Sequence, residues 1–335
     1  METVLELLVS LAIILMGAEI FTNGVEWLGR RLCLNEGAVG SVLAAVGTAL
    51  PETMIPVIAI LFSPNSTGHE IGIGAILGAP LMLSTLAMCV TGAAVLAFRR
   101  RRAANSSLTA DAEVVRRDLG FFLIVYTAAV LTGLVPGRGW QLAIAAFMVF
   151  SYLWYVYETL GGEAGIEEDV AELRRCYFSP RRDTPRLWVI VVQVLAALAM
   201  IVAGAELFVD GVKQIAVAFG VPAFVLAMVI APVATELPEK FNSVLWVARG
   251  KDTLALGNIT GAMAFQSSLI PALGIFFTDW RLSSGALVSA LITLLAAGLL
   301  YLGVRQKGRL SAGLLLSCGA FYALFLVGVW QGAIR

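Results

Sequence analysis

Two glutamates of the chain, Glu52 and Glu239, lie inside long apolar stretches, and a proline directly precedes each of them. A carboxylate inside a bilayer costs about 2.5–3.5 kcal/mol unless something compensates its charge. Each proline also removes a backbone donor and leaves a carbonyl oxygen of the preceding turn without its helical partner. A bound cation would compensate the carboxylates and accept such carbonyl oxygens as ligands, so we predict a metal-ion site at Glu52 and Glu239. A local ion pair of Glu239 with Lys240 is disfavoured, because adjacent residues of a helix point away from each other.

Three segments of the first half of the chain recur in the second half in the same order. The matched pairs are GAEIFTNGVEWLG (17–29) with GAELFVDGVKQIA (204–216), LPE (50–52) with LPE (237–239), and GIGAILGAP (72–80) with ALGNITGAM (255–263). The offset is 187 residues for the first two pairs and 183 for the third. Matches that keep their order indicate an internal duplication.

Apolar residues dominate the composition, since 59% of the 335 residues are hydrophobic and only 14% are charged. Runs of about 20 apolar residues, the length needed to cross hydrocarbon as a helix, recur along the whole chain. We therefore predict an all-α integral membrane protein of about ten transmembrane helices. The predicted spans are 3–28, 37–62, 70–98, 119–135, 139–160, 187–209, 222–248, 253–277, 284–303 and 309–331.

Five spans in each half make the second repeat enter the membrane in the opposite sense from the first. We expect two inverted five-helix repeats, 1–160 and 187–335, joined by a cytoplasmic loop at 161–186. Inverted repeats place their substrate near the bilayer midplane, where discontinuous helices meet. Eighteen Lys and Arg residues lie in the connections on one side of the predicted membrane and four on the other. The basic side is therefore predicted to be cytoplasmic, with both termini on the other side.

At this point the motifs suggest a family. AAVGTALPETMIPVIAI and APVATELPEKFNSVLWVARGKDTLALGNITG resemble the two signature repeats of the calcium/cation antiporter superfamily, which includes the sodium/calcium exchangers and their prokaryotic relatives. The resemblance covers nearly the whole chain. It implies that Glu52 and Glu239 are the two central acidic ligands and that the oxygens of Thr48 and Thr235 contribute to the ion sites.

Several positions depart from the family pattern. Leu83 and Gln266 replace ligands, and Glu236 stands where the family has a serine. Calcium takes 6–8 oxygen ligands, so this site is poorer in oxygen than is usual, although Glu236 adds a third carboxylate three residues before Glu239. Crowded carboxylates in a medium of low dielectric disfavour each other's charged form, which makes proton coupling a hypothesis beside sodium coupling.

Other polar residues in the spans carry weaker predictions. Glu19 and Glu206 occupy matching positions in the first span of each half, and gating or helix packing is as plausible there as ion contact. For Asn23, Asp210 and Asn258 we expect a structural role with hydrogen bonds.

The predicted function is a secondary active antiporter that exchanges a cation, in the first place calcium, for sodium or protons by alternating access. One alternative is another cation, such as potassium, magnesium or a transition metal. A second alternative is that the protein is a member of the superfamily that has lost transport and serves as a membrane sensor or partner subunit. No phosphate loop, zinc-binding helix or nucleophile with its base occurs, so neither enzymatic activity nor a cofactor is predicted.

The expected partners are inorganic cations and the lipid bilayer of a plasma or bacterial inner membrane. The arginine run at 99–102 is explained by topology and anionic headgroups rather than by nucleic acid.

Overall fold

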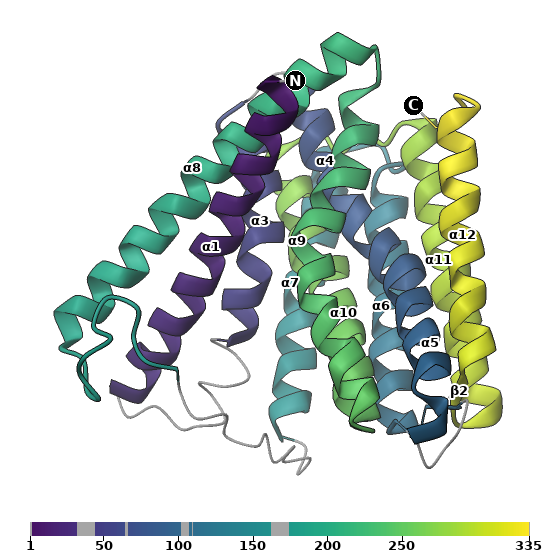
Figure 1. The fold of residues 1–335 in the computed structure, drawn as a ribbon. Coiled ribbons are helices and arrows are strands. Elements are labelled where there is room, and N and C mark those ends of the chain that lie inside the picture. Colours follow the sequence, from purple (N-terminus) through teal and green to yellow (C-terminus); the bar gives the residue numbers. More distant parts are fainter. Residues whose placement is uncertain are drawn as a thin grey trace.

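The structure is a computed structural model that describes residues 2–31, 44–63, 66–101, 107–108, 110–161 and 174–334. Within these ranges the chain is almost entirely helical (Figure 1). The first half contains α1 (Glu2–Arg31), α3 (Ala44–Leu61), α4 (Ser66–Met82), the π-helical segment η2 (Leu83–Ala87), α5 (Met88–Ala97), the 3₁₀ turn η3 (Arg99–Arg101), β1 (Ser107–Leu108), α6 (Ala112–Thr132) and α7 (Arg138–Gly161). The second half contains α8 (Leu187–Phe219), α9 (Ala223–Ala248), α10 (Asp252–Phe277), α11 (Ser284–Lys307), β2 (Leu310–Ser311) and α12 (Ala312–Trp330).

Each predicted apolar segment overlaps a described helix, and the all-α membrane fold is confirmed. Among the described residues, seven helices are long and apolar enough to cross a membrane. Two further apolar helical stretches among the described side chains are shorter, Pro51–Leu61 in α3 and Ala223–Glu236 in α9. Both chain termini lie at the same end of the helix array, at the top of Figure 1.

The expected helix breaks at the LPE motifs do not occur. Helix α3 continues through Pro51 and Pro56, and α9 continues from Ala223 to Ala248 across Pro238. A proline removes only one donor, and neighbouring helices or side chains can satisfy the freed carbonyl inside a membrane protein. The α-helical geometry is instead interrupted at Leu83–Ala87, the π-helical segment that follows Pro80 and joins α4 to α5.

The fourth span also differs from its prediction. Helix α6 begins at Ala112, where the carboxylate of Asp111 caps it by accepting from the backbone N–H groups of Glu113 and Val114. The apolar run on which the prediction rested starts only at residue 119. Arg117 and Asp118, which precede the predicted span, therefore lie within the helix.

Helices α1 and α8 run side by side along one flank of the molecule (Figure 1). Gly17 on α1 and Gly204 on α8, which are repeat mates, permit this close approach. A Cβ at Gly17 would lie 2.8 Å from Ile201 Cγ1, and a Cβ at Gly204 would lie 2.8 Å from Ile14 Cγ1. The pair packs mainly against α3, α4 and α9, whereas α5, α6, α7, α10, α11 and α12 form the rest of the bundle.

Candidate functional site

The carboxylate of Glu236 lies at the centre of the candidate site, where α9 packs against α10. Glu236 is 0% exposed, and the side-chain amide of Gln266, which is 2% exposed, donates a hydrogen bond of 2.5 Å to its Oε1. A buried carboxylate needs such donors, because removal from water disfavours its charged form. The structure thus brings two of the predicted site residues into direct contact.

Thr235 is buried directly before Glu236. Its hydroxyl donates to the carbonyl oxygen of Ala231, one turn earlier, at 2.9 Å. Because a hydroxyl oxygen also carries two lone pairs, it can still act as a ligand after its hydrogen is engaged. The predicted hydroxyl ligand of the second half therefore lies beside the added carboxylate.

Glu52 lies on α3, which packs against both α9 and α10. Its side chain is half-buried, and one of its carboxylate oxygens, Oε2, is fully buried. The side chains of Thr48 and Glu239, the other two predicted ligands, lie outside the described residues. Among the side chains that the structure describes, no group of three His, Cys, Asp or Glu residues is close enough to hold one metal ion.

Four buried hydroxyl groups that follow two of the family-motif positions in sequence were missed by the sequence analysis. They follow Leu83 and Gln266 directly and are Ser84, Thr85, Ser267 and Ser268. Each donates to a carbonyl one turn earlier, Leu81 in the first half and Ala264 in the second. Their lone pairs add oxygen where the family's ligands are replaced. The offset of 183, which aligns LST with QSS, is the signal that would have identified them.

Leu83 itself is fully buried in the main apolar cluster, together with Leu81 and Met82. Its hydrocarbon side chain cannot supply an oxygen ligand. The first half of the site is therefore more apolar than the second, where Gln266 stands at the same position of the repeat.

A second buried polar cluster surrounds Asp118. Its Oδ1 accepts from Arg117 at 3.0 and 3.2 Å and from the hydroxyl of Tyr155 at 2.9 Å, while Thr260 donates to Oδ2 at 2.7 Å. These residues come from α6, α7 and α10. The early start of α6 is what places Asp118 inside the bundle, and the sequence analysis missed the cluster for that reason.

Residues 174–178, which precede α8, form hydrogen bonds with residues of α1 and α8. Asn23 is buried and hydrogen-bonds the amide of Gln193 and the backbone of Arg174, so its predicted structural role is confirmed. Glu19 instead accepts from Arg174 at 3.2 Å and from the hydroxyl of Tyr177 at 2.7 Å, on an exposed face. The hydrogen bond to Glu19 raises the pKa of Tyr177 above its ordinary value.

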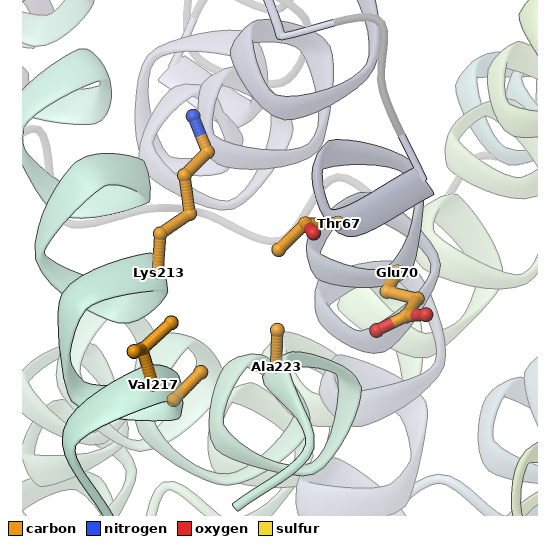
Figure 2. Close-up of a pocket in the computed structure, with 6 residues that line it drawn as sticks. Thr67, Glu70, Lys213, Val217 and Ala223 are labelled. Atoms are coloured by element: carbon orange, nitrogen blue, oxygen red, sulfur yellow. The ribbon is translucent and has the colours of Figure 1, made fainter. Parts of the chain in front are cut away.

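A cavity of about 330 Å³ opens between α4, α8 and the start of α9 (Figure 2). Thr67, Glu70 and Lys213 line its polar side. The Lys213 ammonium donates to Ser63 at 2.9 Å and to Asp210 at 3.0 Å, so it links α8 to the end of α3. Glu206, one turn before Asp210, is exposed.

A bundle of apolar helices that buries carboxylate, amide and hydroxyl groups between proline-containing helices is typical of membrane transporters for ions. The comparison with known families defines the class further. The chain belongs to the sodium/calcium exchanger protein family, whose model matches residues 3–160 and 189–331.

Individual relatives agree with this assignment. The chain is 24% identical to the inner membrane protein YrbG of Escherichia coli, over 98% of this chain and 97% of that protein. It is 23% identical to the sodium/calcium exchanger MaX1 of Methanosarcina acetivorans, over 81% and 82% of the two chains. The fold resembles the crystal structure of the H⁺/Ca²⁺ exchanger CAX with a TM-score of 0.74, at 17% identity, covering 98% of this chain and 82% of that one.

Proposed function

We propose that the protein is a secondary active antiporter that exchanges calcium for sodium or protons across an inner or plasma membrane. The observation that carries the proposal is the buried contact between Glu236, directly before the second LPE motif, and Gln266. A carboxylate removed from water is costly in its charged form, and a bound cation would compensate that cost at Glu236.

The ligand set would combine Glu52 and Glu239 with the hydroxyls of Thr48 and Thr235. Glu236 and the amide oxygen of Gln266 would complete it on the side of α9 and α10. Calcium takes 6–8 oxygen ligands, and carboxylates, hydroxyls and carbonyls together can supply that number. An empty site with several carboxylates is costly to carry through the membrane. Reorientation would therefore require that either the substrate cation or the coupling ion is bound.

The architecture proposed for this transport is two inverted five-helix repeats, residues 1–160 and 187–335, around the site. The repeated motifs, the two residue ranges matched by the family model and the position of both termini at one end of the bundle support it. The excess of basic residues supports a cytoplasmic connection at 161–186 and termini on the other side.

Glu236 favours protons as one coupling ion. The carboxyl group can be neutral when it holds a proton and charged when it holds a cation, so the two would compete for one group. Sodium remains the other candidate, because hydroxyl and carbonyl oxygens suit it without a change in protonation.

A second candidate function rests on Leu83. Its apolar burial removes one oxygen from the first half of the site, which favours either a cation with fewer ligands or a member that no longer transports and acts as a membrane sensor or partner subunit.

Calcium uptake into proteoliposomes, driven in turn by an outward sodium gradient and an outward proton gradient, tests the proposal. The proposal expects uptake with one gradient or both. The absence of uptake with either gradient, followed by uptake in a screen of other cations, would make calcium the wrong ion. No flux with any cation would favour the sensor function.

A further inference from the structure

We propose that Asp118 is a positioning residue that sets the rotation of α10 about its axis, so that Gln266 faces Glu236. The effect that we expect on transport rests on the proposed function. The described hydrogen bonds of Asp118 join it to Arg117, Tyr155 and Thr260, none of which is a candidate ligand, so we infer that it acts on the site through α10.

Three helices meet at this carboxylate. Asp118 on α6 is 2% exposed and receives hydrogen bonds from Tyr155 on α7 and Thr260 on α10. Arg117 neutralises its charge at 3.0 Å and lies over the ring of Tyr155, with 5.2 Å between the guanidinium carbon and the ring centroid. Both carboxylate oxygens accept hydrogen bonds, so the buried charge is paired and directional.

Helix α10 carries a polar contact on each of two faces. Thr260 and Gln266 are six residues apart, which corresponds to about 9 Å along a helix and about 240° around it. Thr260 bonds to α6 and Gln266 bonds to α9, in agreement with that angle. Two contacts at different depths and on different faces hold a helix against both rotation and sliding.

Other described hydrogen bonds hold the two ends of α10: Thr253 Oγ1 accepts from the backbone N–H of Asp111, and the carbonyls of Ile275 and Phe276 accept from Arg138. Between these ends, α10 also packs through apolar side chains. Its buried residues include Ala255, Leu256, Ile259, Met263 and Ala264. Apolar packing is less directional than hydrogen bonding, so it tolerates small rotations that would move the amide of Gln266 away from Glu236. The Thr260–Asp118 bond therefore adds a directional contact near the middle of α10, six residues from Gln266, that favours the rotation in which Gln266 meets Glu236.

The test uses Thr260→Val, which keeps the shape of the side chain but removes its donor, together with Thr260→Ser, which restores the hydroxyl. Half-saturation by calcium and maximal flux are measured separately in proteoliposomes. We expect Thr260→Val to raise the half-saturating concentration about 5-fold, with a smaller change in maximal flux, and Thr260→Ser to stay near the wild type. Thr91→Val serves as the matched control, because Thr91 is similarly buried and its described hydrogen bond goes to the carbonyl of Ala87, one turn earlier in the chain.

A double-mutant cycle makes the test specific. In a Gln266→Ala background, Thr260→Val is expected to change half-saturation less than 2-fold, since the group that it positions is gone. Equal effects in both backgrounds, or a loss of heat stability with unchanged half-saturation, would overturn the proposal.

The cycle also separates this inference from the proposed function. If the wild type transports no cation, the proposed function fails, and the same four proteins are compared by their melting temperatures in detergent. Non-additive melting temperatures of Thr260→Val and Gln266→Ala would then support the positioning of α10, and additive ones would overturn it.

Discussion

The side-chain amide of Gln266 donates a hydrogen bond of 2.5 Å to the carboxylate of Glu236, and both groups are buried. The contact joins α9 to α10 within the region that carries the signature motifs of the sodium/calcium exchanger family. By the resemblance to the family, Glu236 stands at a serine position and Gln266 at a ligand position, so the contact joins two departures from the expected pattern.

The contact predicts a role for Glu236 in the pH dependence of transport. Glu236→Gln keeps a group that can hydrogen-bond Gln266 but cannot release a proton. We expect calcium flux of the wild type to fall as the pH is lowered, because protons compete with the cation, and the variant to show a flatter pH profile. Flux is measured at several pH values with and without sodium. Glu113→Gln, at an exposed glutamate in the first turn of α6, is the control, and an unchanged pH profile in Glu236→Gln would contradict proton coupling at this residue.

The hydrogen bonds around Gln193 predict a structural role for that residue. Its amide binds Asn23 and the backbone of Ile20 on α1, and its oxygen accepts from Cys176 and from the backbone of Phe178. Gln193→Leu should destabilise the protein by about 1–3 kcal/mol, because buried partners are left unsatisfied. Melting temperature and calcium half-saturation are compared with those of Gln214→Leu, an exposed position on the same helix. Equal stability of the two variants would show that the hydrogen bonds contribute little.

The close approach of α1 and α8 predicts that Gly17 does not tolerate a larger side chain. A Cβ there lies 2.8 Å from Ile201 Cγ1 and 3.2 Å from the carbonyl oxygen of Ala197, so Gly17→Val must separate the helices. We expect a loss of about 1–3 kcal/mol of stability from overpacking. In Gly298→Val, the matched control, no described atom lies within 4 Å of the new Cβ. A melting temperature of Gly17→Val no lower than that of the control would argue against the packing described.

The Lys213 ammonium predicts an effect on transport rate with little effect on stability. It bonds Ser63 and Asp210 beside the cavity of Figure 2 and links the α1–α8 pair to α3. A partly exposed ion pair contributes about 0–1 kcal/mol, so Lys213→Met should melt near the wild-type temperature. If the helix pair α1–α8 moves relative to α3 during transport, loss of the Lys213 link should change maximal flux at least about 2-fold. Such a change corresponds to about 0.4 kcal/mol in the activation barrier. An unchanged flux, with Lys307→Met as control, would exclude Lys213 from the moving contact.

Most of the helices could be predicted from the sequence, because apolar runs long enough to span a bilayer are typical of transmembrane helices. The start of α6 could not, since Asp111, Arg117 and Asp118 are polar and the burial of Asp118 depends on partners in α7 and α10. Proline indicated helix breaks at the LPE motifs, but the interruption lies at Leu83–Ala87, which follows Pro80.

The candidate site was predictable as a set of residues but not as a set of contacts. Glu236 and Gln266 were both candidates from the motif, yet they are 30 residues apart in the chain, and only the packing of α9 on α10 shows that they touch. Ser84 and Ser267 were missed because serine is common in membrane helices and only the offset between the repeats marks this pair.

The central claim is that the carboxylates of this site carry the transported cation. The most direct measurement is calcium exchange at equilibrium in proteoliposomes, with labelled calcium on one side, for the wild type, Glu52→Gln, Glu239→Gln and the control Glu113→Gln. The account predicts exchange in the wild type and the control and at least about a 10-fold loss in the other two variants, as expected when a charged ligand is removed. Exchange at the wild-type rate in Glu52→Gln and Glu239→Gln would contradict it.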